Sequence, residues 1–141
     1  MSVEHITEKN FQDMIKKDGI VLIDFWAEWC GPCRAFGPVF EKAAEENTDV
    51  TFAKCDTEAE QALAGALGIR SIPTLMIFRD NVLIFNQPGM LPEPVLKDVI
   101  QKVRELDMVE VLKEVEKAEA EAEQEHEHDE PQPTTSAEGV A

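Results

Sequence analysis

The chain has 141 residues, of which 43% are hydrophobic, and its 29 acidic against 13 basic residues give a formal net charge of −16. This length and apolar content favour one domain with a real core and argue against global disorder. A strongly acidic chain without a basic stripe lacks the charges that neutralise phosphates, so we expect it to bind neither nucleic acid nor anionic lipid. The longest apolar run, residues 19–23, is far shorter than the roughly 20 residues of a membrane span.

The acidic charge is concentrated at the C-terminal end. From Glu105 to Ala141 there are 13 acids and two bases, a net charge of −11, whereas residues 1–104 carry a net charge of −5. The first residues form neither the basic nor the apolar region of a secretory signal, so we expect a cytoplasmic location.

In the first half of the chain, strand-like and helix-like patterns alternate. We expect an edge strand, a helix, a strand buried on both faces and a second helix, over residues 3–6, 7–17, 20–26 and 33–47. Thr7 is the predicted N-cap of the first helix. Pro38 lies inside the second helix and should kink it, because proline removes a backbone hydrogen bond.

The same alternation continues in the second half. We expect a buried strand, a helix, a hairpin of two strands and a last helix, over residues 50–55, 57–67, 75–78 with 82–85, and 92–106. Thr57 and Glu60 have the spacing of a capping box, Gly68 is a stop signal, and Asp80-Asn81 suits the hairpin turn. This order predicts an α/β fold, a central mixed β-sheet flanked by helices on both faces.

The pattern changes beyond Leu106. We expect one domain over residues 1–106, an acidic helical extension over 107–123 and a disordered tail over 124–141, because the apolar period fades and the end is acidic and rich in Pro, Thr and Ser. His126 and His128 lie in this tail. We expect water rather than a metal ion around them.

The chemistry centres on Trp29-Cys30-Gly31-Pro32-Cys33, just after the buried strand and at the start of a helix. A thiolate, not a thiol, attacks disulfides, and the free N–H groups of a helix N-terminus stabilise it. Pro32 lies in the first turn, where a missing N–H costs nothing. The two-residue spacer lets Cys33 reach the sulfur of Cys30, so a mixed disulfide can be resolved internally.

Two other roles for the cysteines, a structural disulfide and a zinc site, have less support in the sequence. A structural disulfide closing four residues would contribute only about 1.9 kcal/mol on the chain-entropy model. A zinc site needs four ligands, and no second C-x-x-C or H-x-x-x-H partner follows, so we expect no metal. Cys55, the third cysteine, lies in a predicted strand and should behave as a small hydrophobe.

The segment from Asp24 to Cys33, Asp-Phe-Trp-Ala-Glu-Trp-Cys-Gly-Pro-Cys, resembles the active-site segment of the thioredoxin family almost residue for residue. The resemblance covers about residues 3–106 and includes Ile69-Arg70-Ser71-Ile72-Pro73-Thr74, similar to the family's cis-proline loop, and Gly89 in a matching late position. It implies the thioredoxin fold. It also implies a thiol–disulfide oxidoreductase that reduces protein disulfides and is itself reduced from NADPH by the flavoprotein thioredoxin reductase. No cofactor would then bind this chain, which we expect to be a monomer.

The resemblance assigns roles to four residues. Cys30 would be the attacking thiolate and Cys33 the buried resolving thiol. Asp24 is a carboxyl within an apolar strand, so its pKa should be raised to where it can exchange a proton with Cys33. Lys54 matches the lysine that neighbours this aspartate in the family.

The family also implies where a substrate would bind. Its cis-proline packs beside the cysteines, and the backbone before it pairs with the incoming strand. The residues expected to contact substrate, called the docking rim below, are Trp29, Gly31, Pro32, Ile72, Pro73, Gly89 and Met90. Ser71, Asn81, Pro88 and Met90 depart from the family's usual residues, which leaves the choice of partner open.

A second hypothesis is a binding module. A thioredoxin-fold co-chaperone or adaptor would use the docking rim and the acidic extension without redox chemistry. The 35 residues after Leu106 are too few for the three or more repeats that a helical solenoid needs. Suppression of client aggregation that survives loss of both cysteines would favour this reading.

Overall fold

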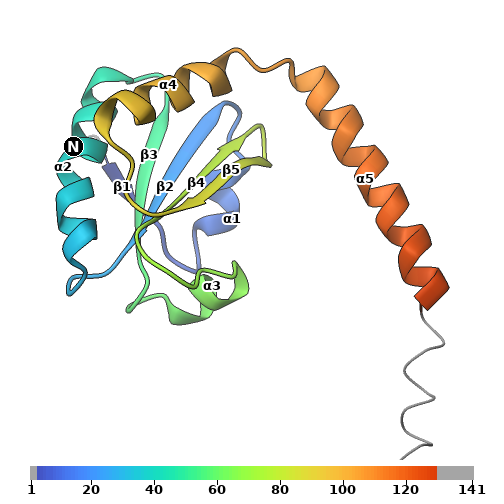
Figure 1. The fold of residues 1–141 in the computed structure, drawn as a ribbon, viewed down its shortest axis with the longest axis horizontal. Helices are drawn as coiled ribbons and strands as arrows, with labels where there is room; N and C mark the ends of the chain where they lie inside the picture. The colour runs from blue at the N-terminus through green and yellow to red at the C-terminus, as the bar shows by residue number, and fades with distance from the viewer. Residues whose placement is uncertain (1–2, 130–141) are drawn as a thin grey trace, which may run out of the picture. The chain divides into compact units, whose positions relative to one another are not determined.

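The structure, a computed structural model, describes residues 3–129 and contains a five-stranded mixed sheet (Figure 1). The spatial order is β1-β3-β2-β4-β5. Strands β1, β3 and β2 are parallel, whereas β4 and β5 pair antiparallel. Their bounds are, from β1 to β5, Val3–His5, Ile20–Trp26, Thr51–Asp56, Thr74–Arg79 and Val82–Pro88. The mixed sheet predicted from the order of elements is confirmed.

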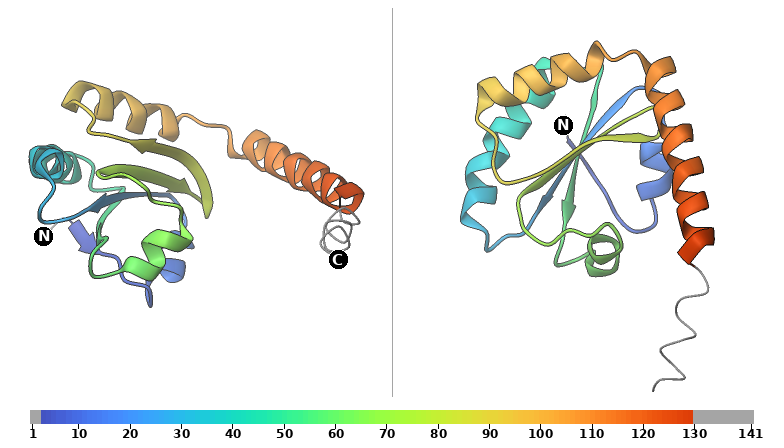
Figure 2. Two further views of the ribbon diagram at one scale, coloured as in Figure 1. Left: turned by 60° about the horizontal axis from the view of Figure 1, so that its bottom comes forward. Right: turned by 45° about the vertical axis from the view of Figure 1, so that its right-hand side comes forward.

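Helices cover both faces of this sheet (Figure 2). On one face α1 (Phe11–Ile15) and α3 (Gln61–Ala66) share an apolar cluster with the odd-numbered residues of β2. On the other face lie α2 (Gly31–Glu46) and α4 (Glu93–Arg104), which contact each other. Because side chains alternate along a strand, the even-numbered positions of β2 face α2 and α4. The predicted α/β architecture is therefore confirmed.

Strand β2 lies between β3 and β4, with hydrogen-bonded neighbours on both edges. Helices cover its two faces, so six of its seven residues are buried. Asp24, in the middle of the strand, has no exposed surface. The continuous apolar run of the sequence predicts this burial, and the structure confirms it.

The first helix is shorter than predicted. It begins at Phe11 rather than Thr7, and Asn10 is its N-cap. The Thr7 N–H donates to Asn10 Oδ1 at 2.8 Å, and the Asn10 N–H donates to Thr7 Oγ1 at 3.3 Å. These reciprocal bonds form a separate turn before the helix, since short polar side chains compete with helical hydrogen bonding.

The predicted capping box at Thr57 and Glu60 is wrong. Thr57 Oγ1 donates to the Trp26 carbonyl at 3.0 Å, and Glu60 Oε1 accepts the Glu8 N–H at 2.8 Å. Both side chains thus bond to distant segments, and α3 begins at Gln61 without a side-chain cap. Local spacing could not reveal these partners.

The end of α3 agrees with the sequence. Gly68, the predicted stop signal, has a φ of +72° just after the helix.

The remaining boundaries differ by a few residues. Helix α2 begins two residues before the predicted start, and α4 is shorter at both ends than residues 92–106. The hairpin turn is as predicted: Asp80 and Asn81 both have positive φ, 52° and 71°. A hydrogen bond from outside the hairpin stabilises this turn: the Gly19 N–H donates to Asp80 Oδ1 at 2.8 Å.

The chain divides into two compact units, residues 1–104 and residues 105–141. In the second, α5 (Met108–Asp129) begins after Asp107, whose Oδ1 accepts the N–H of Val109 at 3.0 Å. The helix continues through residues 124–129, six positions into the segment expected to be disordered, and the Glu- and Ala-rich sequence has a high helix propensity. The rest of that segment lies outside the described residues. Within residues 3–129, no helix combines the length and apolarity needed to cross a membrane.

The hairpin turn gives a first prediction. Replacing Asn81 by Val should lower the free energy of unfolding by about 1–2 kcal/mol, because a β-branched residue tolerates the left-handed region poorly. Urea unfolding followed by circular dichroism measures the change. Asn81→Gly is the control and should be at least as stable as the parent, since glycine adopts positive φ freely. Equal stability of the Val and Gly variants would contradict this account of the turn.

Candidate active site

Cys30 is the N-cap of α2. Its φ of −87° and ψ of 114° are extended, as an N-cap requires, and its Sγ accepts the Cys33 N–H at 3.2 Å. The sulfur thus takes the place of the usual capping oxygen. Pro32 in the first turn needs no hydrogen-bond partner for its nitrogen. A thiolate at Cys30 would meet both this N–H and the positive end of the helix dipole.

Cys30 and Cys33 form a disulfide, with their Cα atoms 5.2 Å apart. Both residues are nearly buried, with 4% and 5% of their surface exposed. Burial therefore does not distinguish attacking from resolving sulfur. The two cysteines differ in their place in the helix, because Cys30 is the cap and Cys33 lies one turn inside.

A distant loop lies against the cysteines. Cys30 Sγ is 3.7 Å from the Ile72 carbonyl oxygen, and Ile72 packs against the small cluster that contains both cysteines. The Ile72–Pro73 peptide bond is cis. The Gly89 N–H donates to the Pro73 carbonyl at 2.7 Å, so a third segment joins the site. The fold thus brings together residues predicted from three separate stretches of sequence.

The docking rim contains residues of very different exposure. Trp29 and Met90 are open to solvent, at 67% and 42% of their surface. Gly31, Pro32 and Gly89 are exposed as well, whereas Ile72 is half-buried and Pro73 is buried. Trp29 is the most exposed large hydrophobic residue among those described.

Asp24 is the buried carboxyl next to this site in the sequence. Within residues 3–129, neither of its carboxyl oxygens has a hydrogen-bond partner. Burial raises the pKa of Asp24 from 3.8 to about 7, and the positive charge of Lys54 opposes part of this rise. The raised pKa expected from the sequence is therefore present, and its main cause is loss of water around the charge.

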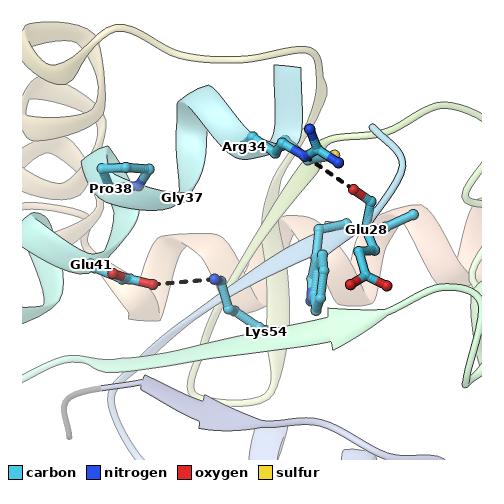
Figure 3. Close-up of a pocket in the computed structure, with 9 residues that line it drawn as sticks. Glu28, Arg34, Gly37, Pro38, Glu41 and Lys54 are labelled. Carbon is cyan, nitrogen blue, oxygen red and sulfur yellow. Dashed lines mark hydrogen bonds and ion pairs between the residues drawn. The ribbon is translucent and has the colours of Figure 1, made fainter. Parts of the chain in front are cut away.

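Lys54 lies in a pocket of about 300 Å³ between α2 and β3 (Figure 3). Its Nζ donates to Glu41 Oε2 at 3.3 Å and lies 5.4 Å from the centre of the Trp26 ring. The Arg34 Nε donates to the Glu28 carbonyl at 3.2 Å. The pocket is lined by Trp26, Ala27, Glu28, Cys33, Arg34, Gly37, Pro38, Glu41 and Lys54.

Glu41 was not predicted from the sequence as part of the site. Helical spacing could have indicated it, because Cys33, Gly37 and Glu41 follow one another at intervals of four positions and so share one face of α2. Trp26 is half-buried and lines this pocket, and its buried Nε1 has no hydrogen-bond partner among the described residues.

Cys55 lies away from this chemistry. It belongs to the apolar cluster with α1 and α3, on the face of the sheet opposite α2. Burial raises the pKa of its thiol to about 12, so it stays protonated and unreactive. Within residues 3–123, whose side chains the structure describes, no group of three or more His, Cys, Asp or Glu side chains could hold a metal ion.

Comparison with known proteins agrees with this geometry. The sequence profile named Thioredoxin matches residues 2–102. The chain belongs to the thioredoxin family. A putative thioredoxin 2 from Streptomyces coelicolor is 59% identical over 114 residues, which are 81% of this chain and 85% of that protein. A thioredoxin from Porphyra purpurea is 41% identical over 72% of this chain and 97% of its own length.

Solved structures of the family are similar in fold. A mutant thioredoxin from Halobacterium salinarum has a TM-score of 0.69 and 39% identity, over 74% of this chain and 93% of that one. A thioredoxin from Malassezia sympodialis has a TM-score of 0.64 and 35% identity, over 70% of this chain and 89% of that one. Family membership, with a Cys30–Cys33 pair at disulfide distance, identifies a thiol–disulfide oxidoreductase.

The buried carboxyl makes stability depend on pH. The pKa of Asp24 is raised in the folded state, so the folded protein holds this proton more tightly than the unfolded chain, and stability falls as pH rises from about 4 to about 7. Within that range, the free energy of unfolding falls by about 1.4 kcal/mol for each unit that the pH rises. Asp24→Asn should therefore be more stable than the parent at pH 8, by as much as about 4 kcal/mol.

This prediction is tested by urea unfolding of both proteins at several pH values. The advantage of Asp24→Asn should be constant above about pH 7 and shrink as pH falls from about 7 to about 4. Asp98→Asn, at an exposed site on α4, is the matched control and should show no such trend. An advantage that stays constant with pH would mean that the folded carboxyl titrates normally.

Proposed function

We propose that this protein is a cytoplasmic, monomeric protein-disulfide reductase that receives electrons from NADPH through thioredoxin reductase. The observation that carries the proposal is the position of Cys30. Its sulfur caps α2, accepts a backbone N–H from Cys33 and lies beside the Ile72 carbonyl. A sulfur at such a helix end is readily ionised and can be approached from the loop side.

In the first step the Cys30 thiolate attacks one sulfur of the substrate disulfide. A bond forms between Cys30 Sγ and that sulfur while the substrate S–S bond breaks, and the released substrate thiolate takes a proton from water. The helix N-terminus lowers the cost of holding the negative charge on Cys30 before attack. The product is a mixed disulfide between the protein and its substrate.

In the second step Cys33 resolves that mixed disulfide. The Cys33 thiol gives its proton to the Asp24 carboxylate, and its sulfur attacks Cys30 Sγ. The Cys30–Cys33 bond forms while the bond between Cys30 and the substrate breaks, and the released substrate thiolate takes a proton from water. Two electrons have then passed to the substrate, and Cys30 and Cys33 are oxidised to the disulfide seen in the structure. The pKa of Asp24, about 7, suits a group that must both accept and return a proton near neutral pH.

The docking rim would hold the substrate during both steps. Trp29 and Met90 offer exposed apolar surface, and the backbone at Ile72 lies beside the reacting sulfur. Lys54 would act on Asp24 by its charge rather than by contact with substrate. The reductase would then return two electrons to the Cys30–Cys33 disulfide, so this chain needs no bound cofactor.

Cys30→Ser should reduce the rate of insulin reduction to the background of dithiothreitol alone, because serine at neutral pH is neither ionised nor able to form a disulfide. The turbidity of precipitating insulin chains measures the rate. Cys55→Ser is the matched control and should remain active, since Cys55 is buried on the other face of the sheet. Activity in the Cys30 variant equal to that of the parent would refute the mechanism.

Cys33→Ser distinguishes the two sulfurs. It should attack once and then remain joined to its substrate through Cys30, because the resolving thiol is missing. Mass spectrometry of the non-reduced protein would show the adduct at Cys30, and the trapped proteins would identify natural substrates.

Asp24→Asn should slow the second step without affecting the first. Loss of the proton acceptor should lower the rate of resolution through Cys33 by about 100-fold at pH 7, the lower range for general acid–base catalysis. Rapid-quench analysis of the mixed disulfide measures the two steps separately. An unchanged resolution rate would remove Asp24 from the mechanism.

A further inference from the structure

Glu41 faces Lys54 across the pocket (Figure 3). It lies on α2, two turns after Cys33, and its Oε2 accepts a hydrogen bond from Lys54 Nζ at 3.3 Å. The side chain of Glu41 is 56% exposed, whereas that of Lys54 is only 19% exposed. The Glu41 carboxylate therefore attracts the Lys54 ammonium from the solvent side of the pocket.

A second carboxyl competes for the same ammonium from inside the protein. Asp24 and Lys54 are paired positions on β2 and β3. The charge of Lys54 acts on Asp24, yet the carboxyl oxygens of Asp24 form no hydrogen bond within the described part of the chain. Lys54 thus bonds the exposed carboxylate and leaves the buried one unpaired.

Gly37 leaves space beside the Lys54 ammonium on the side of α2. A Cβ added to Gly37 would lie 3.9 Å from Lys54 Nζ, an ordinary contact, so position 37 does not crowd the ammonium that Glu41 bonds. The Trp26 ring, 5.4 Å away, accepts the cation on its face. The other titratable side chains that line the pocket are Glu28, Cys33 and Arg34, and the buried residues of α4 are the apolar Leu96, Ile100 and Val103.

We infer that Glu41 is a positioning residue for Asp24: its carboxylate holds the Lys54 ammonium at the mouth of the pocket and keeps it from pairing with Asp24. If Lys54 paired directly with Asp24, the carboxylate would stay ionised near neutral pH and could not return a proton. The inference rests on the proposed function, since it concerns the proton that Asp24 exchanges with Cys33.

The test is Glu41→Gln in the full-length reduced protein, because glutamine keeps the shape but removes the charge. Lys54 should then move towards Asp24, and the titration midpoint of the Asp24 carboxyl should fall by about one pH unit. An opposite charge within about 4–6 Å typically lowers the pKa of an aspartate by 1–3 units. The carbon-13 NMR shift of the Asp24 carboxyl measures the midpoint.

Glu45→Gln is the matched control. It lies one turn after Glu41 on α2, is exposed, and its substitution changes the net charge by the same amount. The Asp24 midpoint should stay at its parent value in this variant. A fall as large as that of Glu41→Gln would assign the effect to net charge and overturn the inference.

A double mutant shows whether Lys54 carries the effect. Lys54→Met alone should raise the Asp24 midpoint, and Glu41→Gln added to it should cause no further change. Lys54→Gln, which keeps a polar end, is a second variant for the same cycle. An unchanged or higher midpoint in Glu41→Gln alone would refute the inference.

Kinetics give a second readout that a merely structural role would not change. In Glu41→Gln the pH profile for resolution of the mixed disulfide should move to lower pH together with the midpoint. The titration does not depend on turnover. A parent protein that fails to reduce insulin would therefore refute the proposed function and still leave the role of Glu41 measurable.

Discussion

The burial of β2 in the centre of the sheet is the constraint on which the site depends. Two hydrogen-bonded neighbours and two helical layers remove water from the middle of this strand, and Asp24 loses its hydration there. Loss of water raises the pKa of its carboxyl to about 7. The same strand leads directly into the turn that places Cys30 at the start of α2. One buried strand thus holds the Asp24 carboxyl and leads to the cysteine that caps α2.

The N-terminus of α2 and the interior of the sheet affect negative charge in opposite ways. The N-terminus of α2 favours negative charge on Cys30, whereas the interior behind it disfavours negative charge on Asp24. Environments that act on two groups in opposite directions separate their pKa values, which is the general basis for assigning acid and base roles. Lys54 and Glu41 lie between these environments, at the pocket beneath α2. Burial of the Asp24 carboxyl lowers the stability of the fold above about pH 4.

Most of the fold could be predicted from hydrophobic periodicity, because β2 is a continuous apolar run and α4 has a regular apolar stripe. The errors occurred where polar side chains bond across the sequence. Thr57 bonds to Trp26 and Glu60 bonds to Glu8. The spacing typical of a capping box therefore gave a wrong prediction here. The acidic helix α5 is longer than its fading apolar stripe suggests. Its Glu and Ala residues favour helix without burying a face.

The sequence by itself determined the kind of chemistry. Two cysteines with two residues between them at a helix start, after a strand with one aspartate, specify a redox pair through local spacing alone. Only the tertiary structure decided what surrounds that pair. It brought Ile72 to Cys30 across 42 positions of sequence and Glu41 to Lys54 across two separate elements. Contacts of this kind depend on how helices pack on the sheet, and local residue patterns do not encode them.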